Sequence, residues 1–312
     1  MEVNNNILIS ICIPVYNREQ YLNDCIQSIV SQDIDSAILE ILFFDDASTD
    51  HSREIIGSFI DNNPQLNVKL LSTPQNKGLW NARNVLYDSA QGKYILCLDA
   101  DDKFAPGILA KLRDIAVDNH PDMVIFPYTV IDTNGGIKRT VNPGYTEISS
   151  MDINNFPIDT YHFAIWNKLI RTDLIRDLDI KVPQGINCWE DLSVTARIYT
   201  IARNIVVLPH VGYYYRKHDS EAYTSHNHKN ILEQHISCTE FITGWFGTNG
   251  LVNDYTAFFN HLKFATKIKM LRGDTFELKR WKKSYPETDK YIMSMPGIPL
   301  YYRVLFKILS LL

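Results

Sequence analysis

The chain has 312 residues, 45% of them apolar and 21% charged, which is typical of a globular protein with one large domain or a domain plus an appendage. Its net charge of −5 argues against general nucleic-acid binding, so we expect no nucleic-acid partner. The charge is uneven, because residues 261–312 hold 11 Lys and Arg against 4 Asp and Glu, a surplus of +7 that leaves −12 elsewhere. The C-terminal end is therefore the part suited to an anionic surface.

The cysteines and the apolar runs bear on location. Five cysteines without CxxC spacing predict reduced thiols (Cys12, Cys25, Cys97, Cys188 and Cys238). No run of 18 apolar residues is present, and residues 1–6 lack the positive charge of a signal peptide. The sequence thus predicts a cytoplasmic protein, and its basic C-terminal end leaves open a peripheral contact with the inner face of the membrane.

The first hundred residues alternate apolar strand patterns with amphipathic helix patterns. Such alternation predicts an α/β fold, with a mostly parallel twisted sheet and helices on both faces. The predicted strands are 7–15, 38–44, 66–71 and 94–98, and the predicted helices are 21–32, 50–62 and 79–90.

After residue 102 the pattern is looser, and from residue 229 onward it is only helical. We therefore divide the chain into an α/β domain, 1–225, and a C-terminal helical region, 226–312. Between them the sequence predicts helices 106–119 and 189–202, strands 123–130, 205–208 and 211–215, and an exposed hairpin or loop over 132–155.

Two of the predicted strands end in aspartates. Asp45 and Asp46 close one strand, and the sequence Asp99-Ala100-Asp101-Asp102 follows another. Ligands bind beyond the carboxyl ends of parallel strands, and clustered carboxylates need a cation or donors to offset their repulsion. Oxygen-only clusters favour Mg²⁺ or Mn²⁺, which hold diphosphates. The alternative is a pair of solvated turns, where Asp is common.

Signatures of other nucleotide-binding and hydrolytic proteins are absent from the sequence. It contains no G-x-G-x-x-G, no G-x-x-x-x-G-K-[ST], no G-x-S-x-G and no H-E-x-x-H. Dinucleotide dehydrogenases, P-loop NTPases and the commonest hydrolases are therefore disfavoured.

Seven groups of residues form short motifs in a fixed order along the chain. They are Ile13-Pro14-Val15-Tyr16-Asn17, Asp45-Asp46-Ala47-Ser48-Thr49-Asp50, Asn76-Lys77-Gly78 with Ala82-Arg83-Asn84, Asp99-Ala100-Asp101-Asp102, Trp166-Asn167-Lys168-Leu169, Glu190-Asp191 and Tyr214-Tyr215-Arg216-Lys217-His218. Together they closely resemble the nucleotide-sugar domain of glycosyltransferase family 2, over about residues 7–224. The resemblance implies a GT-A type fold, with 1–105 binding the nucleotide sugar and 106–225 forming the acceptor side. It also implies an inverting transfer of sugar from a UDP-sugar, or another nucleotide diphosphate sugar, to the hydroxyl of a saccharide or lipid-linked acceptor in surface polysaccharide or glycan synthesis.

Five residues match donor-binding positions of that family. The resemblance implies that Tyr16 packs on the pyrimidine, that Pro14 shapes the turn beside it, and that Asn17 belongs to the same nucleotide-sugar site. It implies that Asp46 accepts the N3–H of the base and that Arg83 lies near the ribose and phosphates. A core tyrosine and a surface arginine are the alternatives for Tyr16 and Arg83.

The sequence Asp99-Ala100-Asp101-Asp102 matches the D-x-D element of the family, which implies a Mn²⁺ or Mg²⁺ cofactor. One carboxylate is expected to reach the ribose and another the metal, and the choice between Asp101 and Asp102 as principal ligand stays open. His218 matches a histidine that completes the metal or diphosphate site, with Arg216 and Lys217 adding charge toward the phosphates. A solvated loop histidine is the alternative.

Glu190 and Asp191 match the family's pair of catalytic acids at the start of a helix. The resemblance implies that Asp191 is the general base, taking the proton of the acceptor hydroxyl as it attacks the anomeric carbon opposite the diphosphate. An N-terminal helix charge with a structural role is the alternative. Trp166 and Trp189 either stack on sugars or fill the core.

Three other functions compete with an inverting transferase: a nucleotidyltransferase, a non-catalytic nucleotide-sugar binding module, and a retaining transferase. A nucleotidyltransferase would need a Gly-rich basic loop after the first strand, where Tyr16-Asn17-Arg18-Glu19 stands instead. The final segment, residues 300–312, is apolar with two basic residues and either lies in a membrane interface or packs on the body as a terminal helix.

Overall fold

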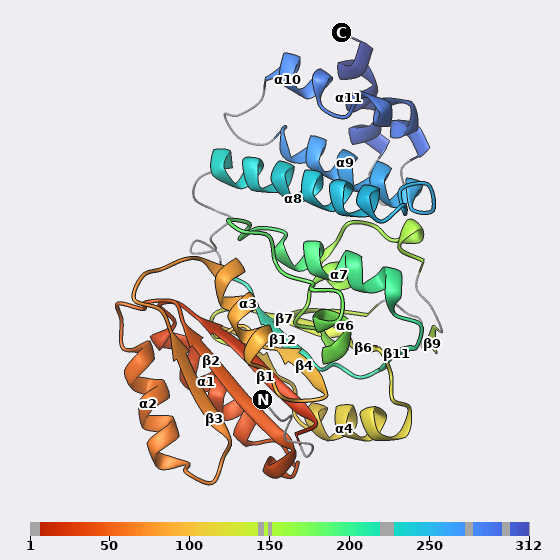
Figure 1. Cartoon of the computed structure of the whole chain (residues 1–312). Helices are drawn as coiled ribbons and strands as arrows, with labels where there is room; N and C mark the ends of the chain where they lie inside the picture. Colours follow the sequence, from red (N-terminus) through yellow and green to blue (C-terminus); the bar gives the residue numbers. More distant parts are fainter. Residues whose placement is uncertain are drawn as a thin grey trace.

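A computed structural model describes residues 7–142, 147–148, 152–218, 228–271, 277–294 and 300–311. It contains a large sheet with the strand order β3-β2-β1-β4-β10-β6-β11-β9, flanked by helices, and a helical region above it (Figure 1). The large-sheet strands are β1 (Ile9–Val15), β2 (Leu39–Asp45), β3 (Val68–Ser72), β4 (Tyr94–Cys97), β6 (Met123–Ile125), β9 (Glu147–Ile148), β10 (Lys168–Arg171) and β11 (Ile205–Val207).

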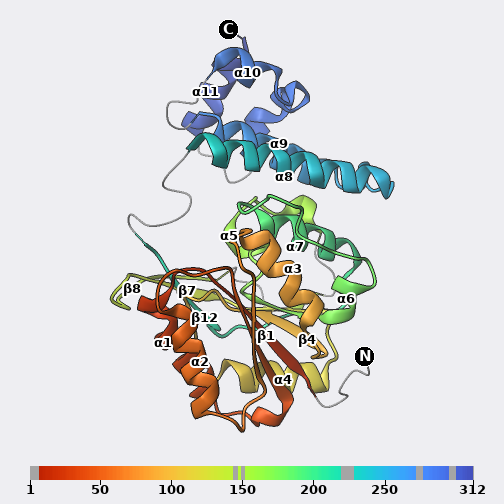
Figure 2. The same ribbon diagram turned by 60° about the vertical axis from the view of Figure 1, so that its left-hand side comes forward.

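The predicted α/β class and the GT-A type arrangement are confirmed. Strands β3, β2, β1 and β4 run parallel, and β1 and β2 are buried along almost their whole length, as their continuous apolar sequences require. Helices α3, α6 and α7 lie on one face of the sheet and α1 and α2 on the other (Figure 2). The helices of this part are α1 (Glu19–Val30), α2 (Ser52–Asn62), α3 (Leu79–Ser89), α4 (Ile108–Asp118), α5 (Thr160–Phe163), α6 (Thr172–Arg176) and α7 (Glu190–Ile201), with 3₁₀ turns η1 (Ser36–Ile38) and η2 (Ile153–Asn155).

The strand order reverses between β1 and β4. The chain builds outward from β1 to β2 and β3, and then returns to place β4 on the other side of β1. A crevice forms beyond the carboxyl ends of the strands at such a point, because the connecting helices leave on opposite faces. The residues that follow β1 and β4 therefore meet at one end of the sheet.

The second half of the sheet departs from the sequence-based expectation. The predicted strand 123–130 is wrong as a single element: β6 belongs to the large sheet and β7 (Tyr128–Ile131) to a smaller one, with Pro127, which has no backbone N–H to donate, between them. Strand β10, which was not predicted, lies antiparallel between β4 and β6. The smaller sheet has the order β5-β12-β7-β8, with β5 (Lys103–Phe104), β8 (Ile137–Val141) and β12 (Tyr213–Arg216).

The segment 132–155, predicted as an exposed hairpin or loop, is partly described. Strand β8 pairs antiparallel with β7 and is exposed along most of its length, as a hairpin requires. Strand β9 pairs with β11 at the edge of the large sheet. Residues 143–146 and 149–151 of this segment lie outside the described residues.

The helical region rests on the α/β part through α7. Helices α8 (His228–Thr248) and α9 (Thr256–Lys269) place Cys238, Ile242, Phe246 and Phe258 in the same apolar core as the sheet. A second, smaller core lies on the far side of α9, around Phe264, Trp281 and Phe306. It joins α10 (Leu278–Lys283), the 3₁₀ segment η5 (Pro286–Ser294) and α11 (Leu300–Leu311).

Two further expectations concern cysteines and membrane spans. All five cysteines lie among the described residues, are buried and form no disulfide, as predicted. In the described part of the chain, no helix has both the length and the apolar character needed to cross a bilayer.

Two glycines give a matched test of how tightly the sheet is packed. A Cβ on Gly92, just before β4, would lie 2.6 Å from the backbone nitrogen of Ser10 in β1, whereas a Cβ on Gly57 in α2 meets no atom within 4 Å. We expect Gly92→Ala to lower the free energy of unfolding by about 1–3 kcal/mol through overpacking. Gly57→Ala should leave it unchanged or raise it by up to about 1 kcal/mol, because Ala favours helix. Urea unfolding of both variants would measure this, and equal stabilities would contradict the close approach.

Candidate active site

A cavity of about 740 Å³ opens where the strand order reverses. This volume is in the range of small-molecule sites. Loops after β1, β2 and β4, the start of α3, and the end of β12 supply its walls. We call it the donor cavity; it is lined by Pro14, Val15, Tyr16, Asn17, Arg18, Glu19, Gln20, Tyr21, Asp46, Asp50, Asn76, Lys77, Gly78, Leu79, Ala82, Asp99, Ala100, Asp101, Asp102, Asn187, Tyr215, Arg216 and His218.

The loops after β1 and β2 are bound to each other by side chains. Asn17, which adopts a left-handed φ of 51°, accepts a hydrogen bond from the N–H of Thr49 (2.8 Å), while its own N–H donates to Ser48 Oγ (3.0 Å). The N–H of Arg18 donates to Ser52 Oγ (2.8 Å). Asn17 therefore shapes the cavity, and its side-chain oxygen is engaged within the protein.

Tyr16 and Pro14, from the end of β1, lie on the cavity wall. The Tyr16 side chain is 44% exposed, so the core alternative for this residue is wrong. Asp46 follows β2, lines the same cavity, and accepts the N–H groups of Lys77 (2.9 Å) and Gly78 (2.7 Å). An exposed aromatic face and a fixed carboxylate thus share the same cavity.

Asp99, after β4, lies over a buried arginine. Arg83 on α3 is 1% exposed, so the surface alternative for it is wrong, and its Nη2 donates to Asp99 Oδ1 at 2.8 Å. The same Nη2 lies 3.8 Å from Asp191 Oδ1. Arg83 is not among the lining side chains, so it supports the acids from below. Burial raises the pKa of Asp99 to about 6, although Arg83 acts to lower it.

Asp101 faces the cavity in a different setting. Its Oδ2 lies 3.0 Å from His218 Nε2 and 3.2 Å from Arg18 Nε. Burial acts to raise the pKa of Asp101, but the hydrogen bond from His218 and the charge of Arg18 together lower it. His218 is 13% exposed and packs edge-on against Tyr21, so it is not a solvated loop histidine.

Asp102 is held on both oxygens by protein donors. Its Oδ1 accepts the backbone N–H of Arg216 (2.6 Å) and its Oδ2 the hydroxyl of Tyr213 (2.8 Å). Burial, and then the charge of Asp101, raise the pKa of Asp102. These bonds join the residues after β4 to β12 of the smaller sheet.

Arg216 and Lys217 differ from the expectation that they add charge toward phosphates. The guanidinium of Arg216 is buried, donates to the carbonyls of Asp101 (2.9 Å) and Thr133 (2.7 Å), and lies 4.8 Å from the ring centroid of Tyr21. Lys217 is exposed and does not line the cavity. The basic residues on the wall that keep solvent exposure are Arg18, which is half-buried, and Lys77, which is exposed; neither was assigned a binding role from the sequence.

Glu190 and Asp191 begin α7 and line a second cavity of about 400 Å³. Asp191 Oδ2 accepts the N–H of Ile165 (3.1 Å), and its buried Oδ1 has no hydrogen-bond partner among the described residues. Burial, and then the charge of Asp191, raise the pKa of Glu190. Tyr215 lines both cavities, so the two adjoin there.

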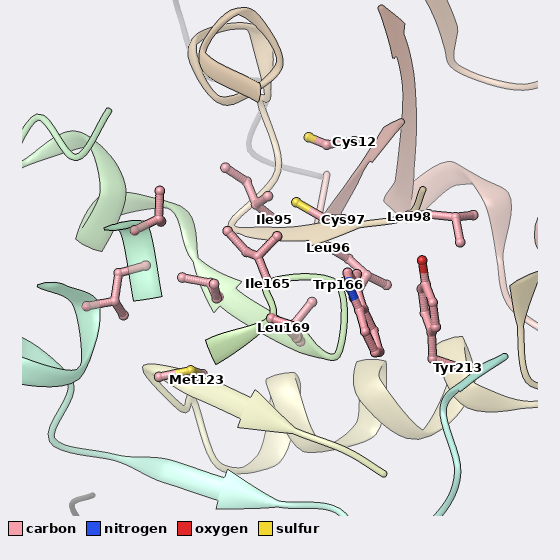
Figure 3. Close-up of a cluster of buried hydrophobic side chains, with 14 of the residues drawn as sticks. Cys12, Ile95, Leu96, Cys97, Leu98, Met123, Ile165, Trp166, Leu169 and Tyr213 are labelled. Carbon is pink, nitrogen blue, oxygen red and sulfur yellow. The ribbon is translucent and has the colours of Figure 1, made fainter. Parts of the chain in front are cut away.

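The two tryptophans have different environments. Trp166 is 4% exposed and packs with its ring centroid 4.5 Å from that of Tyr213 and 5.3 Å from that of Tyr215 (Figure 3 shows it beside Tyr213). Trp166 is thus a core residue with an edge on the second cavity. Trp189 is half-buried, and it lines the same cavity from a left-handed φ of 65°.

A buried lysine supports the loop that contacts Asp191. Lys168, at the start of β10, donates from Nζ to the carbonyls of Ala164 (2.6 Å) and Tyr161 (3.2 Å) and to Asn167 Oδ1 (2.8 Å). Burial lowers the pKa of Lys168 to about 7. The motif Trp166-Asn167-Lys168-Leu169 therefore has a structural role, which sequence reasoning had not separated from binding.

This lysine should leave a signature in the pH dependence of stability. Between about pH 7 and 10.5 the unfolded chain binds a proton at Lys168 that the folded chain lacks, so this group makes stability rise with pH, by up to about 1.4 kcal/mol per pH unit. Lys168→Met removes that contribution. Urea unfolding of both proteins across this range should show a shallower rise for Lys168→Met. Parallel pH curves would contradict the depressed pKa.

Comparison with known proteins agrees with the motifs. Residues 10–178 match the model of the family "Glycosyl transferase family 2". The poly(ribitol-phosphate) beta-N-acetylglucosaminyltransferase TarS of Staphylococcus aureus is 28% identical over 225 residues, 69% of this chain and 37% of that protein. A poly(ribitol-phosphate) beta-glucosyltransferase of Bacillus spizizenii is 30% identical over 218 residues, 68% of this chain and 33% of that protein. The match thus spans about a third of the length of each relative.

Solved structures share the fold. The crystal structure of S. aureus TarS 1–349 superposes with a TM-score of 0.71 at 22% identity, covering 97% of this chain and 88% of that one. The same fragment in complex with UDP-GlcNAc gives 0.64 at 22% identity and the same coverage. Because the family model covers more than half of its residues, this chain belongs to glycosyltransferase family 2.

Proposed function

We propose that this chain is an inverting glycosyltransferase that transfers a sugar from a UDP-sugar to an acceptor hydroxyl in glycan synthesis. The observation that carries the proposal is the pair of adjoining cavities, one with the donor-type residues and the other with Asp191. Structures of a relative in complex with UDP and with UDP-GlcNAc support the choice of donor class. Family membership disfavours a nucleotidyltransferase, and the intact acids disfavour a non-catalytic module.

The donor cavity has a base end and a phosphate end. Tyr16 offers its exposed face to a pyrimidine, since base stacking on an aromatic ring is worth ~1–3 kcal/mol. Asp46, with each oxygen already fixed by a backbone N–H, retains lone pairs to accept the N3–H of uracil. Arg18, whose Nε lies 3.2 Å from Asp101 Oδ2, is the basic side chain on the wall at the end proposed for the diphosphate.

The residues at the phosphate end fit a divalent cation with two protein ligands. Asp101 Oδ2 and His218 Nε2, 3.0 Å apart on the cavity wall, would hold it, together with phosphate oxygens. The described residues contain no group of three metal-ligating side chains, so a metal here would need oxygens of the bound diphosphate to complete its coordination. We assign the ligand role to Asp101 because both oxygens of Asp102 accept protein hydrogen bonds. When bound, Mn²⁺ or Mg²⁺ would stabilise the charge of the departing diphosphate.

We assign Asp191 the role of general base. The N–H of Ile165 fixes its Oδ2 and Arg83 Nη2 lies 3.8 Å from its Oδ1, while 18% of the side chain stays exposed on the second cavity, where the acceptor hydroxyl would approach. The hydroxyl oxygen then attacks the anomeric carbon as the bond to the diphosphate breaks, so a single displacement inverts the configuration. Glu190 is the less suitable base because burial raises its pKa and so disfavours its ionised form.

Metal dependence of UDP binding tests the donor site. The donor cavity is lined by six acids but only three Lys or Arg, so the diphosphate needs an added cation. Calorimetry should show UDP binding with Mn²⁺ that weakens about tenfold or more in EDTA, the equivalent of ~1.4 kcal/mol. Asp101→Asn should lose this metal effect. Equal UDP affinity in Mn²⁺ and EDTA would exclude the metal.

Two carboxylate variants separate binding from chemistry. Asp191→Asn should keep UDP affinity and lose about 10²–10⁴-fold in turnover, because only the general base is removed. Asp46→Ala should weaken UDP binding. Donor affinity by calorimetry and UDP release from UDP-GlcNAc would measure both. An Asp191→Asn protein with most of its turnover would remove Asp191 as the base.

We also propose that the protein lies peripherally on an anionic membrane through α11. One side chain of this helix, Phe306, is fully buried, whereas apolar side chains on its other sides are exposed. The surplus of +7 in residues 261–312 adds attraction, about 1 kcal/mol for each Lys or Arg near an anionic leaflet. The exposed side chains are Leu300, Tyr301, Tyr302, Val304, Leu305, Ile308 and Leu311.

Cosedimentation with phosphatidylserine-containing liposomes at low salt tests this contact. Leu305→Glu combined with Ile308→Glu should abolish sedimentation without a change in melting temperature, since both side chains are exposed. Val117→Glu, at an exposed position on α4, is the matched control and should sediment like the wild type. Wild-type protein that stays in the supernatant would rule out the membrane contact.

A further inference from the structure

The second cavity, of about 400 Å³, is built by two regions that are far apart in the sequence. Helix α5, the start of α7 and Tyr215 of β12 supply part of its wall, and α9 of the helical region contributes Ala265, Ile268 and Lys269. Figure 1 shows α8 and α9 stacked over α7. The helical region is therefore part of a binding surface.

We propose that this cavity is an acceptor subsite that holds an uncharged sugar ring, with α9 as one of its walls. The proposal rests on the proposed transferase function and specifies the acceptor class. We call it the acceptor cavity.

Four aromatic side chains line the acceptor cavity: Phe163, Trp166, Trp189 and Tyr215. Phe163 and Trp166 are buried, so the half-buried rings of Trp189 and Tyr215 are the ones available to the C–H face of a sugar ring. Trp189 holds a left-handed φ of 65°, a conformation that is strained for a bulky residue. Strain of this kind persists where the surroundings fix it: the ring of Trp189 packs on His235 of α8 with centroids 4.2 Å apart.

The charges of the wall favour a neutral ligand over a polyanion. The ionisable side chains that line the cavity are Asp159, Glu190, Asp191 and Lys269, three acids against one base. A phosphate group placed there would meet the Asp191 charge, whereas the hydroxyls of a neutral sugar can donate to these carboxylates. The chemistry of the wall thus points to a sugar ring.

The position of Asp191 indicates how a sugar ring bound in the acceptor cavity would react. Asp191 lies on this wall, and Tyr215 separates the acceptor cavity from the donor cavity. A ring held here would present a hydroxyl to the base at the boundary with the bound donor. Because α9 closes the opposite side, the depth of the cavity depends on the small side chain of Ala265.

Ala265→Trp fills the acceptor cavity from α9 and tests the proposal. Ala257→Trp, at an exposed position on the same helix outside the cavity, is the matched control. The probes are methyl β-glycosides of glucose, galactose and N-acetylglucosamine, and glycerol 3-phosphate as the anionic probe. Saturation-transfer NMR in the presence of UDP and Mn²⁺ would report their binding, and calorimetry would report that of UDP.

We expect at least one methyl glycoside to bind the wild type and Ala257→Trp, and to bind Ala265→Trp about tenfold more weakly or not at all. UDP affinity should be equal in the three proteins. Ala265→Leu, a smaller intrusion, should give an intermediate loss if Ala265→Trp folds poorly.

Two results would overturn the subsite while leaving the transferase proposal intact: normal UDP binding with no glycoside bound to the wild type, or glycoside binding equal in wild type, Ala265→Leu and Ala265→Trp. Preferential binding of glycerol 3-phosphate would overturn the choice of a neutral ligand. Loss of UDP binding by the wild type itself would count instead against the proposed function.

Discussion

The buried guanidinium of Arg83 is the interaction on which the rest of the site depends. It lies on α3 beneath both acid groups, hydrogen-bonded to Asp99 and close to Asp191. Burying a cation is costly unless acids compensate it, and burying acids is costly unless a cation compensates them. Burial acts to lower the pKa of Arg83, but Asp99 and the other anionic neighbours hold it well above its ordinary range. The positive charge of Arg83 therefore offsets the negative charge of one carboxylate on each cavity, Asp99 and Asp191.

A second constraint determines whether Asp101 or Asp102 has an oxygen available to bind a metal. Tyr213 and the backbone of Arg216 take both oxygens of Asp102, which attaches the smaller sheet to the end of β4. Asp101 points the other way, toward His218 and Arg18. Each acid of this short motif therefore has its own environment. Asp99 forms a salt bridge, Asp101 pairs with a histidine, and both oxygens of Asp102 accept hydrogen bonds from the protein.

The helical region contributes to both cavities. Gln234 on α8 accepts the N–H of Asn187, whose side chain accepts the N–H of Trp80 and lines the donor cavity. Helix α9 closes the acceptor cavity through Ala265 and Ile268. Because α8 and α9 share the main apolar core with the sheet, a change in the helical region is expected to reach the site.

The sequence by itself determined the order of the first seven elements, the α/β class and the family, because continuous apolar runs, helical stripes and short motifs are local patterns. It also determined that Asp46 and Asp99 stand at strand ends, and therefore at one edge of a parallel sheet. Only the tertiary structure decided that Arg83 is buried, that Asp102 is clamped by Tyr213, and that Lys168 supports the loop beneath Asp191. It also placed Ala265 on the acceptor cavity. Arg83 meets Asp99 across 16 positions, the loop that Lys168 supports meets Asp191 across 26, and Tyr213 meets Asp102 across 111. The acceptor cavity joins α7 and α9, which share no motif, so no local pattern encodes these roles.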